Sequence, residues 1–289
     1  MTLRPLALIA FAWWLAATPA TAAESYDNCT GFIDALPAVV STQGTWCLRK
    51  DVSTAMASGT AISIQANNVT LDCNGFKLGG LAAGLDTGAN GIGWINRNNI
   101  TVRNCSIRGF EYGLNANGGG DAYHAIENNR FDGNTHVGIH LAGDNHRVVG
   151  NQLNDTGGSP GWAGSFGMSI TGDHVVVQGN TIAGVWVSDT ANNGNGSAYG
   201  IVAVTGRGNV FQDNHILALI PRGTGSARAL AVAHALVQGN VVLNAAGGGT
   251  TAVDGSNDGA PPSLCIGNRI SGYTTTLDTC TSGGGNLTF

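Results

Sequence analysis

Apolar and polar positions repeat along this chain in a six-residue unit: one apolar residue, two variable residues, Asn, one variable residue and a second apolar residue. Eight copies occur, with Cys once in place of Asn, and they begin at Leu71, Val102, Ile126, Val148, Val177, Phe211, Val237 and Cys265. The spacing ranges from 22 residues (Asn129 to Asn151) to 34 residues (Asn180 to Asn214). A repeat of this length predicts a solenoid, because one unit cannot bury its own apolar side and stacked units can.

Short strands are predicted within each unit. Segments of a few residues alternate apolar with small or polar residues, which is the period of a β-strand. The clearest begin at Gly113, Gly138, Gly167 and Gly200. Only residues 32–40 have helical periodicity, so we predict a short amphipathic helix there that caps the first coil. The pattern therefore predicts one all-β solenoid of about 8–10 coils, in which successive coils pair in parallel.

The repeated Asn has a structural explanation. The backbone turns sharply between strands, and Asn tolerates the left-handed conformation of such turns. Its side chain can also pair with the Asn of the next coil and form an internal ladder. Several histidines stand five or six residues before a repeat Asn, where Asn68 and Asn99 stand in earlier coils, and we interpret them as a stack of turn residues. They are His124, His146, His174 and His234.

The N-terminus has the pattern of a cleaved secretory signal. Arg4 supplies positive charge, residues 6–15 form an apolar run, and small residues follow up to Ala23. A membrane anchor is the alternative, but it needs about 20 apolar residues. We therefore expect a signal peptide at 1–23, a cap and first strands at 24–60, and the β-helix at 61–289. The mature protein would be secreted or periplasmic, with no membrane span.

Composition adds two constraints. The chain has 45 Gly among 289 residues and 43% hydrophobic residues, which fits many turns between buried strands. Only 11% of the residues are charged, with a net charge of −5 and no basic patch, so nucleic acid is not an expected partner.

Six cysteines in an exported chain predict three disulfides. We expect neighbours to pair, as Cys29–Cys47, Cys73–Cys105 and Cys265–Cys280. A metal site is the alternative, but no pair has the short Cys-x-x-Cys spacing that is usual in zinc sites.

Residues 67–80 and 98–109 resemble the opening of pectate-lyase-like proteins, the superfamily of right-handed parallel β-helices. The lead-in at residues 44–51 is similar to the first strand of the same superfamily. The resemblance covers nearly the whole mature chain and implies a single right-handed parallel β-helix. The superfamily contains polysaccharide lyases, hydrolases, epimerases and surface proteins, so the resemblance implies the fold and no single reaction.

Function in a solenoid often lies in loops inserted on one face. Three consecutive coils have long connections, at residues 154–166, 188–199 and 218–228, which should project from one edge and wall a groove. Aromatic and charged side chains in a groove suit a polysaccharide, because sugar faces stack on aromatic rings and hydroxyls bond to charged groups. Ordinary loop decoration is the alternative. The expected substrate-binding residues are Asp155, Trp162, Trp186, Asp189 and Tyr199.

His140 is the candidate catalytic base. Ile139 and Leu141 should point into the core, so His140 should point outward beneath the long loops. A histidine there could act as a general base near neutral pH, or be an ordinary surface residue. Its expected catalytic partners are Arg222 and Arg228, which could neutralise a uronate carboxylate. Calcium is the candidate cofactor, and its candidate ligands are Glu111, Asp121 and Asp144. A copper or zinc site built from histidines of neighbouring coils is the alternative, but no His-Glu-x-x-His or similar ligand spacing occurs.

We therefore expect polysaccharide as the partner of a monomer with uronan lyase-like activity. The calcium-binding Asp cluster and Arg of pectate lyases cannot be placed in this sequence. The Asp-Asp and Gly-His-Gly motifs of polygalacturonase-like hydrolases and the Asp-Pro-His motif of alginate epimerases are absent. The alternative is a non-catalytic glycan-binding or surface β-helix protein. A metal-delivery role is a third hypothesis, which rests only on the seven histidines.

Overall fold

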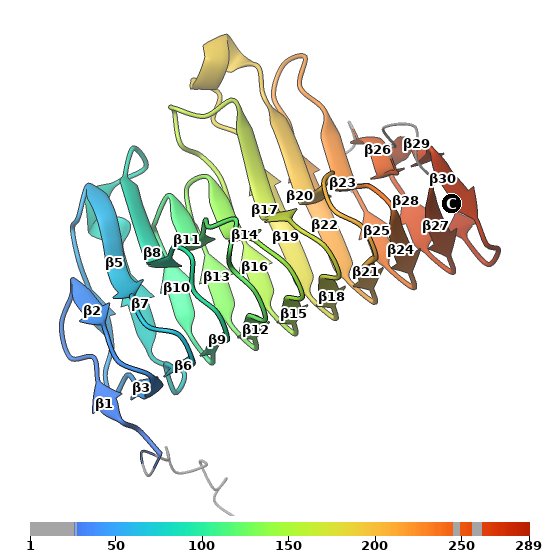
Figure 1. The fold of residues 1–289 in the computed structure, drawn as a ribbon. Helices are drawn as coiled ribbons and strands as arrows, with labels where there is room; N and C mark the ends of the chain where they lie inside the picture. The colour runs from blue at the N-terminus through green and yellow to red at the C-terminus, as the bar shows by residue number, and fades with distance from the viewer. Residues whose placement is uncertain (1–25, 27, 245–248, 256–261) are drawn as a thin grey trace, which may run out of the picture.

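The computed structural model describes residues 26, 28–244, 249–255 and 262–289, so the expected signal peptide lies outside the described residues. The described chain winds through three parallel sheets that run the length of the molecule (Figure 1). From β3 to β29, each coil passes through sheet A, then sheet C, then sheet B before the next coil begins. The prediction of an all-β solenoid of about 8–10 coils is confirmed.

The elements are short. Sheet A consists of β1 (Gly31–Phe32), β3 (Gly44–Cys47), β6 (Val69–Asp72), β9 (Ile100–Arg103), β12 (Ala125–Glu127), β15 (Arg147–Val149), β18 (Val176–Gln178), β21 (Asn209–Gln212), β24 (Ala235–Gln238), β27 (Ser263–Ile266) and β30 (Cys280–Ser282). Sheet C consists of β4 (Val52–Ser53), β7 (Lys77–Gly79), β10 (Ser106–Arg108), β13 (Arg130–Asp132), β16 (Gln152–Asn154), β19 (Thr181–Trp186), β22 (His215–Ile220), β25 (Val241–Leu243), β28 (Arg269–Ser271) and β31 (Leu287–Thr288). Sheet B consists of β2 (Ala38–Val40), β5 (Ser58–Ile64), β8 (Gly88–Trp94), β11 (Tyr112–Ala116), β14 (Val137–Ala142), β17 (Gly164–Thr171), β20 (Ser197–Ala203), β23 (Ala227–Val232), β26 (Gly249–Asp254) and β29 (Tyr273–Asp278). Two 3-10 helices, η1 (Leu81–Ala83) and η2 (Ala191–Gly194), lie in loops.

The two apolar positions of the repeat form continuous columns in the core. Val102 and Ile126 share one register on sheet A and are fully buried. Ile107 and Phe131 share one register on sheet C and are also fully buried. Each such side chain contributes roughly 1.5–3 kcal/mol to the free energy of unfolding. The repeat therefore spans one corner of the solenoid, with its apolar residues on the two sheets that meet there.

The predicted asparagine ladder occupies this corner. The Nδ2 group of Asn151 donates to Oδ1 of Asn180 at 3.0 Å, and Asn180 donates to Asn214 at 3.0 Å. The backbone N–H of Asn151 also donates to Oδ1 of Asn180, at 2.9 Å. The same bonds connect every repeat Asn from Asn129 to Asn268 and end at Asn286. The ladder satisfies backbone groups that would otherwise be buried without partners.

Two details of the ladder differ from the prediction. Left-handed backbone is used by the residue before a ladder Asn, such as Asn128 or Asp213, because the ladder Asn itself must aim its side chain inward. Asn74 lies outside the ladder, since its corner is two residues longer, and its side chain donates instead to the carbonyl oxygen of Leu48.

The helix predicted over residues 32–40 is wrong. This segment contains the end of β1 and all of β2, which pair in parallel with β3 and β5. Backbone pairing with the next coil decided its structure, because an extended segment satisfies the edge of both sheets. At the other end of the chain, residues 281–289 add β31 and the last ladder residue, Asn286.

All three predicted disulfides are confirmed. The Cα–Cα distances are 5.9 Å for Cys29–Cys47, 4.7 Å for Cys73–Cys105 and 6.0 Å for Cys265–Cys280. The first ties residues before β1 to β3, and the other two link adjacent coils of sheet A. Each cross-link therefore restrains the unfolded chain, and Cys73–Cys105, which closes the longest of the three loops, restrains it most.

The predicted histidine stack is divided between two register positions. His124 and His146 are buried and stacked, with ring centroids 4.7 Å apart and planes 6° apart. His174 and His234 stand one position earlier, where they adopt positive φ as Asn99 does. The nitrogen Nδ1 of His146 accepts the backbone N–H of His124 at 3.1 Å, so the buried pair forms a second polar ladder.

No helix among the described residues is long and apolar enough to cross a membrane.

Candidate functional site

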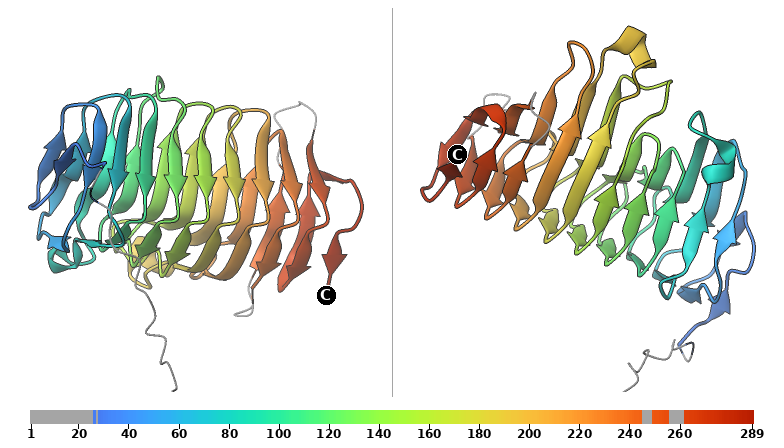
Figure 2. Two further views of the ribbon diagram at one scale, coloured as in Figure 1. Left: turned by 90° about the horizontal axis from the view of Figure 1, so that it is seen from below. Right: turned by 180° about the vertical axis from the view of Figure 1, so that it is seen from behind.

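The three long loops predicted from the sequence follow β16, β19 and β22 and project from the same edge of the solenoid (Figures 1 and 2). Backbone bridges connect Gly157 with Trp186 and Gly196 with Arg222. The backbone N–H of Ser197 donates to the carbonyl oxygen of Ala163 at 2.9 Å. The loops therefore support one another and form one raised wall.

Sheet B has a step where these taller coils begin. Val137, the first residue of β14, pairs with Phe166, whereas β17 already begins at Gly164. The taller strands thus continue beyond the start of β14. At this edge of sheet B, β17 and the loop before it therefore extend past the first residue of β14.

An aromatic cluster fills this step. Trp162 stacks on His136, with ring centroids 4.1 Å apart and planes 4° apart. Tyr112 and Phe166 approach His136 edge-on, at 5.4 and 5.7 Å. His136 is 5% exposed and Trp162 is 44% exposed. The buried imidazole therefore covers one face of the indole and leaves much of Trp162 open to solvent.

Burial sets the electrostatics of the cluster. Oε1 of Glu111 lies 3.9 Å from Nδ1 of His136. Burial raises the pKa of Glu111, and a hydrogen bond from the side chain of Trp162 opposes that rise. Burial lowers the pKa of His136 to about 4, with the nearby His140 adding to the effect. Burial thus disfavours a charged pair, and His136 is neutral at neutral pH.

His140 occupies the outward position that the sequence predicted. It lies on β14 in register with Asn115 and Ser169, and its side chain is half-buried. The ring of Tyr112 meets it edge-on at 5.9 Å. Burial lowers the pKa of His140, so its imidazole is neutral near pH 7 and can accept a proton.

Aromatic residues continue from the step along sheet B. Phe166 and Tyr199 stack with centroids 4.9 Å apart and planes 6° apart. They belong to one register row that crosses five strands: Tyr112, Val137, Phe166, Tyr199 and Arg228. The row runs along the solenoid axis, from β11 to β23.

The two expected catalytic arginines have other partners. Arg228 donates from Nη1 to Oδ2 of Asp254 on the next coil, at 2.8 Å. Arg222 donates from Nε to the carbonyl oxygen of Val187 at 3.3 Å. The strands of His140 and Arg228 are three spacings apart, or about 14 Å. The two side chains would therefore meet different parts of a long ligand.

Three expected substrate-binding residues lie outside the aromatic cluster. Trp186 belongs to β19 of sheet C, and its ring occupies the place that a Cβ of Gly158 would take. Asp155 is exposed in the turn after β16, with a φ of 53°. Asp189 is exposed beside η2.

The candidate calcium ligands do not converge. Asp144 donates its backbone N–H to the carbonyl oxygen of Asp121 at 3.1 Å, in neighbouring turns after β11 and β14. Glu111 lies at the opposite end of β11. The described ranges contain no group of three or more His, Cys, Asp or Glu that could hold a metal ion.

Sequence reasoning missed His136, Tyr112 and Phe166. Tyr112 and Phe166 flank the glycines at which two predicted strands began, so their register was readable, but their outward direction was not. His136 lies outside the histidine periodicity. Its contact with Trp162 joins residues from different coils, and no local pattern signals it.

Residues 51–272 match the family model described as right handed beta helix region. No curated protein sequence is significantly similar to this chain. Among solved structures, the catalytic domain of a GH87 alpha-1,3-glucanase in complex with nigerose is 11% identical, with a TM-score of 0.40. The alignment covers 89% of this chain and 63% of the glucanase domain.

Two further structures are similar at the same level. The Dettilon tailspike protein is 14% identical with a TM-score of 0.41, over 88% of this chain and 56% of its own. The mannuronan C-5 epimerase A-module of Azotobacter vinelandii is 12% identical with a TM-score of 0.39, over 90% and 83%. The present chain thus spans less than two thirds of the glucanase domain and of the tailspike.

Proposed function

This chain belongs to the right-handed β-helix family, and we propose that it binds polysaccharide across the step in sheet B. The observation that carries the proposal is the stack of Trp162 on His136. A buried imidazole holds the indole in place while 44% of Trp162 stays exposed. An aromatic ring fixed in this way is a ready platform for the apolar face of a sugar.

The surroundings of Trp162 support a long ligand in preference to a small one. Tyr112, Phe166 and Tyr199 extend the aromatic surface along the axis of the solenoid. Glu111 and His140 add polar groups that can bond to hydroxyls. The raised loops give this surface a wall on one side. A surface that extends along the axis in this way suits a polymer.

Binding can be tested with purified mature protein and a panel of neutral and acidic polysaccharides, by affinity electrophoresis or calorimetry. We expect Trp162→Ala to weaken binding at least about tenfold, since loss of a central aromatic contact usually costs more than 1 kcal/mol. Tyr123→Asn is the control, because Tyr123 is 64% exposed in a turn beside sheet A. Binding that survives Trp162→Ala unchanged would refute the proposed platform.

A lyase activity is the second candidate, and the contact between His140 and Tyr112 favours it. Elimination needs a base for the proton next to the uronate carboxylate and an acid for the leaving oxygen. The neutral imidazole of His140 can take the proton, and the phenol of Tyr112, whose pKa burial raises, can supply one. Absorbance of the unsaturated product, followed with and without calcium, tests this candidate. Turnover that persists in His140→Ala would remove His140 from the chemistry.

We also propose that the protein is exported and monomeric. Three disulfides suit an oxidising compartment, and the N-terminal pattern suits a cleaved signal. Mass spectrometry of the protein recovered from culture medium and periplasm would locate it and define the mature N-terminus. Size-exclusion chromatography with light scattering would give the oligomeric state.

A further inference from the structure

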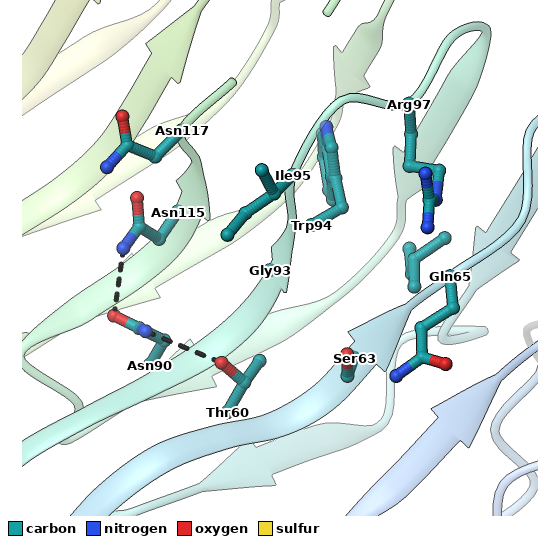
Figure 3. Close-up of a pocket in the computed structure, with 11 residues that line it drawn as sticks. Thr60, Ser63, Gln65, Asn90, Gly93, Trp94, Ile95, Arg97, Asn115 and Asn117 are labelled. Carbon is teal, nitrogen blue, oxygen red and sulfur yellow. Dashed lines mark hydrogen bonds between the residues drawn. The ribbon is translucent and has the colours of Figure 1, made fainter.

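A pocket lies on sheet B, on the coils that precede the step (Figure 3). It has a volume of about 320 Å³ and lies over β5, β8 and β11. Gly93 forms its floor. A Cβ at this position would lie 3.0 Å from the carbonyl oxygen of Asn115 and 3.2 Å from the methyl group of Thr60. The lack of a side chain at Gly93 therefore keeps the pocket open.

A row of hydrogen bonds fixes one side of the pocket. Asn115 donates from Nδ2 to Oδ1 of Asn90 at 3.2 Å, and Asn90 donates from Nδ2 to Oγ1 of Thr60 at 3.4 Å. The row sets the direction of both amides and leaves Oδ1 of Asn115 at its end. This oxygen is buried and has no partner in the described part of the chain. A buried acceptor without a donor is costly, so a ligand hydroxyl there would be stabilising.

Arg97 stands at the other end of the pocket, facing Gln65 (Figure 3). Its Nη1 donates to the carbonyl oxygen of Asn96 at 2.9 Å, and its Nε is buried with no partner among the residues described. Asp121 accepts the backbone N–H of Arg97. No carboxylate of the described ranges forms an ion pair with the guanidinium.

Arg97 gives the pocket a positive charge, which the nearby carboxylate of Asp121 reduces without forming an ion pair. Arg97 is the one charged residue among the described residues that line it, and the rest of the lining is amide, hydroxyl and apolar. The chain as a whole has a net charge of −5. A guanidinium without a carboxylate partner, inside a pocket of an acidic protein, favours an anionic group.

The pocket adjoins the proposed binding surface at Asn115. Asn115 is in register with His140 on the next strand. The five strands from β5 to β17 are separated by four spacings, or about 19 Å. Arg97 follows the end of β8 and Trp162 precedes the start of β17, so one polymer that reaches both would cross sheet B obliquely.

We propose that this pocket is a second saccharide subsite, which takes a sugar residue with its acidic group at Arg97 and a hydroxyl at Asn115 Oδ1. The inference rests on the proposed polysaccharide binding and narrows the ligand to an acidic polysaccharide. The apolar side chain of Ile95, which is 63% exposed beside the pocket, offers a surface for the face of the sugar ring.

The test compares oligosaccharides of galacturonate, mannuronate and guluronate with neutral glucose oligosaccharides of equal length, by calorimetry on the full mature chain. We expect Arg97→Gln to weaken binding of the acidic ligand about tenfold and to reduce its salt dependence. Arg207→Gln is the matched control, because it removes the same charge from an exposed turn elsewhere. Asn115→Ala should weaken binding as well, and thermal unfolding reports whether each variant folds.

The possible outcomes distinguish the subsite proposal from the proposal of polysaccharide binding. Acidic binding that both Arg97→Gln and Trp162→Ala weaken supports the subsite. Binding that Trp162→Ala weakens and Arg97→Gln leaves unchanged overturns the subsite and keeps the polysaccharide proposal. Preference for neutral oligosaccharides overturns the subsite in the same way. Absence of binding to every ligand of both panels overturns both.

Discussion

His146 stacks on His124 with ring planes 6° apart, and its Nδ1 accepts the backbone N–H of His124. Burial lowers the pKa of His124 to about 3 and also lowers the pKa of His146. This hydrogen bond needs an unprotonated Nδ1 on His146, so the stack consists of neutral imidazoles. Its stability is therefore linked to pH.

We expect the free energy of unfolding to fall as the pH drops from about 6.5 towards 4. A histidine with a depressed native pKa stays neutral in the folded protein while the unfolded chain takes up protons below about pH 6.5. The loss approaches about 1.4 kcal/mol per pH unit for each such group. Glu111 and Asp121, whose pKa values burial raises, act in the opposite direction at the lower end of this range.

Thermal unfolding followed between pH 8 and 4.5 checks this expectation. The double variant His124→Asn and His146→Asn should make the curve shallower and leave the contribution of His136 and His140, whose pKa values burial also lowers. Asn should fit this site, because Asn209 already stands in the same register column. His215→Asn, at an exposed position, is the control. An unchanged pH profile in the double variant would show that the His124–His146 stack does not cause the pH dependence of stability.

Removal of one ladder residue should destabilise the whole solenoid. Asn180→Ala deletes the acceptor for both N–H groups of Asn151 and the donor to Asn214. Buried groups left without partners cost about 1–3 kcal/mol each, so we expect a loss of several kcal/mol. Chemical denaturation measures it. Gln152→Ala, at an exposed position one residue from Asn151, should change stability by less than about 0.5 kcal/mol.

Alanine substitutions at two glycines should distinguish the cost of backbone strain from the cost of steric overlap. Gly157 has a φ of +127°, and a Cβ there would overlap the carbonyl oxygen of Trp186. Gly133 has a φ of +56° with nothing near its Cβ position. Gly133→Ala should therefore cost about 1–2 kcal/mol, whereas Gly157→Ala should cost clearly more. Gly157→Ala should also weaken ligand binding, because Gly157 lies in the loop that carries Trp162. Equal losses of stability in the two variants would contradict this account.

His136 should act on ligand binding through Trp162. We expect His136→Ala to lower affinity for the polysaccharide about as much as Trp162→Ala, because the indole loses the ring that supports it. His136→Phe should restore most of the affinity, since it returns an aromatic ring to the same place. Fluorescence anisotropy decay of Trp162, in a variant whose other mature-chain tryptophans are replaced by Phe, would report whether the indole becomes more mobile. A normal affinity in His136→Ala would show that the stack does not position Trp162.

The sequence alone determined the structure of a single coil, because every coil repeats the same pattern of apolar residues around an Asn. The apolar residues on either side of Asn180 identify the core of two sheets, and neighbouring cysteines such as Cys73 and Cys105 identify stacked coils. Such signals recur in every coil, 22 to 34 residues apart, and concern local bends and burial. They were sufficient for the solenoid, the ladder and the disulfides. They also gave the outward direction of His140.

Tertiary structure alone decided which outward side chains meet. Glu111, His136 and Trp162 lie on three successive coils, and the step that joins them depends on differences in loop length. The Asn115 and Arg97 ends of the pocket likewise come from different coils, over a glycine whose role appears only with its neighbours in place. The strand β2 formed against local helical periodicity, since pairing with β5 satisfied more backbone groups than a short helix could. Contacts between coils have no fixed spacing in the sequence, and these contacts shape the candidate site.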